Sequence, residues 1–249
     1  MANERFASFM EAAPKTFLQG LYEESSTQKH PLGTKRVLSD GREYIYVQNG
    51  GANLAAGFLA QAPIGDVANT ANLAIAANAA AGNKAIYITN GDHDLLGTAN
   101  AFAEGWIWVN TGSGVIGDLY KIRGHAAIAA NAAGWVNLYD TIRTALTTSH
   151  KVSVRPNAYK GVLLDAGTAV IVGAAFMDLT ANYYGWLQLR GPCALSTDGT
   201  VVLMNRVYNS AGEIIPSTAN GNDMSKLCYI GKVISVNAND HASLVMLEL

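Results

Sequence analysis

The clearest strand signal in the chain is Tyr-Tyr-Gly-Trp-Leu-Gln-Leu-Arg-Gly-Pro-Cys-Ala-Leu-Ser-Thr-Asp-Gly-Thr-Val-Val-Leu-Met, residues 183–204. Side chains in a strand alternate between two faces, so Leu187 and Leu189 share one face and Trp186 lies on the other. The pair Asp198-Gly199 follows, and both residue types adopt the left-handed dihedrals of a tight turn. The stretch therefore predicts two strands joined by a hairpin at Asp198-Gly199.

Similar short runs recur along the chain between turn-forming residues. They lie at 41–48, 84–89, 106–110, 135–139, 151–154, 161–164, 169–175, 227–236 and 243–249. Stretches rich in Ala and Asn, at 69–83 and 125–134, have high helix propensity, but interrupting Asn and Gly residues favour β structure with small-residue turns. Residues 213–223 have the composition of a long exposed loop. We predict a mainly β protein whose short antiparallel strands form one or two barrel- or sandwich-like domains.

The N-terminal segment differs from this pattern. Phe6, Phe9, Phe17 and Tyr22 have spacings typical of short amphipathic turns, interrupted by Pro14. Two interpretations are open: a helical segment packed on its own domain, or an arm whose aromatic residues dock on a neighbouring molecule. We predict a partly helical arm at 1–36, with these four aromatic residues as a protein interface.

Two β domains are expected after this arm. The Arg-Pro-Asn break at 155–157 precedes the second group of strands, and we place a soft boundary near residue 165. The predicted domains are 37–164 and 165–249.

Composition restricts the range of functions. The chain has 249 residues, a net charge of −2 and 14% charged residues, against about 25% in an average soluble domain. Nucleic acid and anionic membranes are therefore not expected as main partners. A surface so poor in charge suits a protein covered by neighbours. The only cysteines, Cys193 and Cys228, are expected to be buried reduced thiols, with a single disulfide as the alternative.

Candidate catalytic and ligand sites are weak. Asp92-His93-Asp94 follows a turn and has no further ligands in metal-binding spacing, so a polar turn is favoured over a metal site. The glycines of 111–114, Thr-Gly-Ser-Gly, indicate a hairpin turn and not a phosphate loop. Trp106 and Trp108 share one strand face and are expected in the core, with a ligand platform as the alternative. We predict no catalytic function and no cofactor.

Several of these motifs resemble tailed-phage virion proteins, most closely capsid decoration (cement) proteins. The motifs are Gly-Arg-Glu-Tyr at 41–44 with Asn-Gly-Gly at 49–51, Asn-Leu-Tyr-Asp-Thr-Ile-Arg-Thr-Ala-Leu-Thr-Thr at 137–148, Arg-Pro-Asn-Ala-Tyr-Lys-Gly at 155–161, and Tyr-Gly-Trp-Leu-Gln at 184–188 with Gly-Pro at 191–192. The likeness spans about residues 35–249 and leaves the N-terminal segment out.

The resemblance implies a non-enzymatic protein that binds the major capsid protein lattice on the capsid exterior. It also implies association as a homotrimer and assembly in the host cytoplasm. The alternative is a tail or fibre component that binds a host surface glycan through its tyrosines and tryptophans. A cell-wall hydrolase would need a carboxylate pair, and none can be identified in the sequence.

Overall fold

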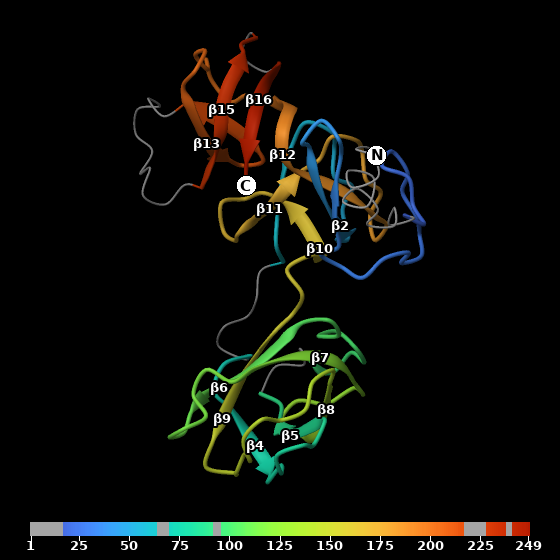
Figure 1. Ribbon diagram of the computed structural model, residues 1–249, viewed down its shortest axis with the longest axis vertical. Helices are drawn as coiled ribbons and strands as arrows, with labels where there is room; N and C mark the ends of the chain where they lie inside the picture. The colour runs from blue at the N-terminus through green and yellow to red at the C-terminus, as the bar shows by residue number, and fades with distance from the viewer. Residues whose placement is uncertain (1–16, 64–69, 92–95, 217–227, 238–240) are drawn as a thin grey trace, which may run out of the picture.

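The computed structural model describes residues 17–63, 70–91, 96–216, 228–237 and 241–249. These residues form a mainly β protein with two bodies, a larger body and a closed barrel (Figure 1). The chain leaves the larger body after β3 (Leu59–Gln61), builds the barrel, and returns to the larger body at β10 (Lys160–Leu164). The barrel is thus an insertion between two strands of one sheet.

The larger body contains a ten-stranded sheet. Besides β3 and β10, its strands are β1 (Lys35–Val37), β2 (Glu43–Asn49), β11 (Ile171–Ala174), β12 (Tyr184–Ser196), β13 (Arg206–Ser210), β14 (Glu213–Pro216), β15 (Tyr229–Ser235) and β16 (Ala242–Glu248). The pairings β2–β10–β3–β11–β12–β2 return to their first strand, so these strands close into a ring. The second half of β12 continues the sheet through β16, β15, β13 and β14.

Strand β12 therefore belongs to both halves of the larger body. Within the ring its Leu187 packs inward with Ile45 and Val47 of β2. Further along, Leu195 joins a separate core formed with the last strands, including Val245. Because β12 is long enough to serve two cores, it fixes the position of one half relative to the other.

The outer face of β2 and β12 is also buried. Trp186, Tyr44 and Tyr46 point away from the ring interior and are at most 1% exposed. The covering segment is 17–34, whose Leu21 and Leu32 are buried in the same cluster. Strands β2 and β12 are thus covered on both faces, which explains why aromatic residues alternate with aliphatic residues in their sequences.

The expected helical arm is not supported where the structure describes it. Residues 17–36 form turns, an isolated bridge and β1, with no helix. Their apolar residues do not form a helical stripe because they follow the contour of the sheet that they cover. Residues 1–16, which include Phe6 and Phe9, lie outside the described part of the chain.

The barrel closes through the strand order β4-β5-β8-β7-β6-β9. These strands are β4 (Leu73–Ala77), β5 (Ala85–Thr89), β6 (Trp106–Thr111), β7 (Leu119–His125), β8 (Ala133–Leu138) and β9 (Lys151–Arg155). Aliphatic side chains such as Ile86, Ile88 and Ile107 fill the interior. Residues 73–83 and 125–134 of the Ala/Asn-rich stretches therefore form strands and turns, as predicted.

The placement of Trp106 and Trp108 in a core was wrong. Ile107 and Val109 of β6 point inward, and the two tryptophans lie on the outer surface, with Trp106 42% exposed. The alternation of side chains along a strand puts both tryptophans on one face of β6, but it does not show which face points into the barrel. A narrow barrel interior accepts branched aliphatic side chains more readily than two indole rings.

Two predicted connections were also wrong. Strand β12 pairs with β2, β11 and β16, so Asp198-Gly199 does not close a hairpin, although Gly199 has the positive φ of 94° expected of a turn. Of the predicted loop 213–223, residues 213–216 are strand β14 and pair with β13, while residues 217–223 lie outside the described part of the chain. The expected boundary near residue 165 falls between β10 and β11, and both of these strands pair with β3.

Candidate interaction surface

The last strands present exposed apolar side chains on the outer side of the sheet. Met246 of β16 lies between Pro192 of β12 and Lys232 of β15, and Leu244 lies opposite Ala194. Met204 extends this surface, because its N–H donates to the carbonyl of Val233 at 2.9 Å. We call this surface the apolar sheet face: Pro192, Ala194, Met204, Ile234, Leu244 and Met246.

The sequence of β16 explains why this face is apolar. In Ala-Ser-Leu-Val-Met-Leu-Glu, Val245 and Leu247 point into the core, while Leu244 and Met246 point outward and are 37% and 39% exposed. An antiparallel strand with one solvated face normally alternates apolar and polar residues. An outer face with apolar residues on three neighbouring elements is typical of a surface that binds another molecule.

A hollow of about 380 Å³ adjoins this face. It is lined by Tyr22, Arg42, Ala56, Gly57, Phe176, Gln188, Pro192, Cys193, Ala194 and Ala242. Pro192 and Ala194 belong to both the hollow and the apolar sheet face, so the two form one continuous surface. A partner seated on the face could insert a side chain here.

Aromatic rings shape one side of the hollow. The ring of Tyr22 lies 5.4 Å from that of Phe176, which lies 5.1 Å from that of Tyr44. The Arg42 guanidinium binds Asp40 at 2.8 Å. The hydroxyl of Tyr44 is buried and has no hydrogen-bond partner among the described residues, and burial raises its pKa. The hollow is thus apolar with a few polar groups near it, a composition common in binding pockets.

The predicted interface residues lie in different environments. Phe17 packs against Trp186 with 5.5 Å between ring centroids, under the guanidinium of Arg36 at 4.7 Å. Tyr22 is 67% exposed at the hollow. The structure places Tyr22, and not Phe17, next to the apolar sheet face. Phe6 and Phe9 lie outside the described residues.

The candidate catalytic residues do not form a recognisable set where they are described. Asp92, His93 and Asp94 lie outside the described residues, and within those residues no group of three or more His, Cys, Asp or Glu could hold a metal ion. His125 is buried, which lowers its pKa, and its Nε2 accepts the N–H of Phe102 at 3.2 Å. This histidine therefore holds a turn against β7.

The loop at 111–114 connects paired strands. Gly112 and Gly114 have φ values of 122° and 78°, and they lie between β6 and β7, which pair antiparallel. The prediction of a hairpin connection is confirmed.

The cysteines have opposite environments, and neither forms a disulfide. Cys193 is buried, as predicted, and burial raises its pKa to about 12. Cys228 is exposed, so the prediction that it is buried was wrong, because it lies just before β15 and not within the core.

We expect a maleimide at neutral pH to label Cys228 in the folded chain and Cys193 only after denaturation, because the reagent can reach the exposed thiol of Cys228 and not the buried thiol of Cys193. Peptide mass mapping of the labelled chain gives the measurement. Rapid labelling of Cys193 in the folded chain would contradict its placement in the core.

In the described part of the chain, no helix has both the length and the apolar character needed to cross a membrane. Comparison with known protein families, with curated proteins and with solved structures gave no match. The function is therefore argued from the surfaces described above.

Proposed function

We propose that the chain is a non-enzymatic structural protein of a tailed phage, which decorates and stabilises the capsid by binding the major capsid protein lattice. It would act on the capsid exterior after assembly in the host cytoplasm, without a cofactor. The motif resemblance to cement proteins supports the phage assignment. The apolar sheet face, with its adjoining hollow, supports a role in protein binding.

The apolar sheet face is the observation that carries this proposal. Each apolar side chain removed from water contributes about 25 cal/mol per Å² of buried apolar area. A specific interface of ordinary size buries about 800 Å² on each partner, with an apolar centre and a polar rim. Arg190 and Glu248 lie opposite each other at one end of the face and Lys232 lies beside Met246, and these charged residues supply such a rim.

We propose that three copies associate on the capsid. The low charge density supports contacts between copies, and closed rings form when two different surfaces of each copy meet. Phe6 and Phe9 would anchor the N-terminal segment to an adjacent copy or to the shell. Tyr22, at the rim of the hollow, would lie in the contact.

A double substitution tests the role of the face. We expect Leu244→Ser with Met246→Ser to weaken binding to empty expanded heads by about tenfold or more, because two apolar contacts at the centre of the interface are lost. Both side chains point outward, so the fold should be retained. Cosedimentation of the purified chain with heads gives the affinity.

The matched control is Ile116→Ser with Leu119→Ser, which removes two exposed apolar side chains from the barrel. This control should bind heads like the parent chain. Equal binding by the Leu244/Met246 variant, or no binding of the parent chain to heads, would contradict the proposal.

A further inference from the structure

The outer surface of β7 and β8 carries a second candidate site, remote from the apolar sheet face. On β8, Trp135, Asn137 and Tyr139 point outward in alternation with the buried Val136 and Leu138. Trp135 is 51% exposed and Tyr139 48% exposed. At about 3.3 Å per residue, these two rings are about 13 Å apart along the chain, which leaves room for more than one sugar ring.

A neighbouring aromatic ring supports Trp135. Tyr87 of β5 lies opposite Trp135 in the pairing of β5 with β8, and the ring centroids are 4.8 Å apart with a tilt of 43°. The exposed indole is thus packed on one side by Tyr87 and free on another. A fixed and partly exposed aromatic ring is suited to stacking on the apolar face of a flat ligand.

A polar hollow of about 420 Å³ lies beside this platform. It is lined by Asn100, Arg123, Gly124, His125 and Asn137. The side chains of Arg123 and Asn137 form no hydrogen bond or ion pair within the described residues. A guanidinium with no carboxylate partner among these residues can bind an anion, and it does so best in a bidentate manner.

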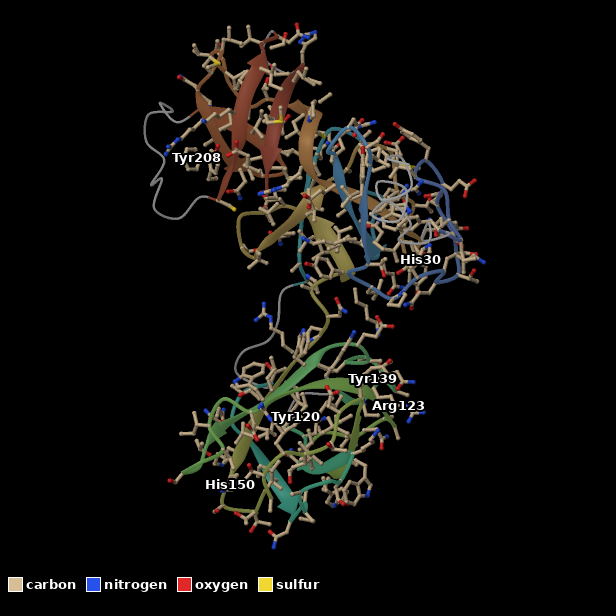
Figure 2. The ribbon with its side chains drawn as sticks, viewed as in Figure 1. His30, Tyr120, Arg123, Tyr139, His150 and Tyr208 are labelled. Atoms are coloured by element: carbon tan, nitrogen blue, oxygen red, sulfur yellow. The ribbon has the colours of Figure 1, made fainter. Side chains whose placement is uncertain are left out.

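The backbone of β7 builds this hollow. The pairing with β8 shifts between Ile122 and Gly124, which makes Arg123 the extra residue of a β-bulge. Bulges re-aim a side chain and are frequent beside functional sites. Figure 2 shows Arg123 and Tyr139 on the same flank of the barrel. The bulge therefore leaves Arg123 without a partner residue on β8, and its side chain is exposed.

Gly124 and Asn100 complete the wall of the hollow. A Cβ on Gly124 would lie 2.6 Å from Oδ1 of Asn100, which accepts the N–H of His125 at 3.0 Å. The glycine thus lets Asn100 approach the strand, while the amide nitrogen of Asn100 remains free to donate. Gly124→Ala would push Asn100 out of place and change the shape of the hollow.

We propose that this surface binds an acidic glycan, with the carboxylate or phosphate on Arg123, sugar hydroxyls on Asn137 and Asn100, and a ring stacked on Trp135. Lys121, whose ammonium lies 5.6 Å from the ring of Tyr139, adds a second positive charge at the far end. Single-stranded nucleic acid also stacks on aromatic rings, but it requires a cationic groove along its backbone. Two cations on a chain of net charge −2 favour a ligand with fewer charges.

Calorimetric titration tests the proposal. The full chain is titrated with a panel of oligosaccharides that carry carboxylates or phosphates, with a neutral maltohexaose and with an oligothymidylate. We expect binding to at least one acidic oligosaccharide and at least tenfold weaker binding to the neutral one. The affinity should fall at least tenfold in Arg123→Gln and in Trp135→Ala.

Arg155→Gln is the matched control, because it removes an exposed arginine from β9 of the same barrel. It should bind like the parent chain, and melting curves verify that each variant is folded. The proposal is overturned if no acidic oligosaccharide binds, if Arg123→Gln and Gly124→Ala bind like the parent chain, or if the oligothymidylate binds most tightly. Binding of Arg123→Gln to phage heads should be unchanged, which separates this site from the proposed capsid contact.

Discussion

A chain that begins at Lys35 is expected to lose most of its stability. Residues 17–34 cover Tyr44, Tyr46 and Trp186, and their own Leu21 and Leu32 are buried. Full burial of a leucine is worth about 1.5–3 kcal/mol, so the two leucines alone contribute about 3–6 kcal/mol. The total stability of a typical domain is about 5–15 kcal/mol. Urea unfolding monitored by tryptophan fluorescence measures the loss.

A chain that begins at Phe17 is the control for this truncation. It keeps the covering segment and removes only residues 1–16, so the difference in unfolding midpoint between the two truncated chains measures the contribution of residues 17–34. Its affinity for heads should fall if Phe6 and Phe9 are anchors. An unchanged unfolding midpoint for the chain that begins at Lys35 would show that residues 17–34 are not part of the core.

Gly231→Ala is expected to be the most damaging single substitution in the last strands. A Cβ at this position would clash with the carbonyl oxygen of Met246, which belongs to the backbone of the paired strand β16. The clash can be relieved only by separating β15 from β16. We expect a loss of about 3 kcal/mol or more in the free energy of unfolding, at the upper end of overpacking effects.

Gly51→Ala is the matched control, because a Cβ at Gly51 meets nothing within 4 Å. This substitution should change the free energy of unfolding by no more than about 0.5 kcal/mol, as most surface substitutions do. Chemical denaturation of both variants gives the comparison. If Gly231→Ala were as stable as Gly51→Ala, the pairing of β15 with β16 would be wrong, and with it the apolar sheet face.

The positions of most strands could be predicted because their signals are local. Alternation in β2, and turn residues such as Asn49-Gly50-Gly51, act within a few residues of one another. Strand pairing could not be predicted in the same way. Strand β2 pairs with β10 and β12, both on the far side of the barrel insertion, and the short β3 that pairs with β10 and β11 has only three residues.

The sequence of β2 indicates that its outer face is covered as well as its inner face. Tyr44 and Tyr46 alternate with Ile45 and Val47, so both faces of β2 are apolar and both need cover. The covering segment has no strand or helix period, since its side chains are placed by the surface beneath them. It was therefore predicted to be a partly helical arm.

The apolar sheet face had a signal of the same kind. The run Leu-Val-Met-Leu at 244–247 has apolar residues at both even and odd positions, and such a sequence indicates a strand that is covered on both faces. The structure covers only the face of Val245 and Leu247. The hollow beside Tyr22 had no local signal, because it joins segments distant in sequence. The bulge at Arg123 had none because it depends on the register between β7 and β8.

We propose that this chain binds a phage capsid through its apolar sheet face, and a virion map at side-chain resolution would show that contact. We expect density for the chain on the capsid exterior, with Leu244 and Met246 against the major capsid protein and Trp135 turned toward solvent. Density in the tail, or on the capsid with Leu244 and Met246 facing solvent, would contradict it.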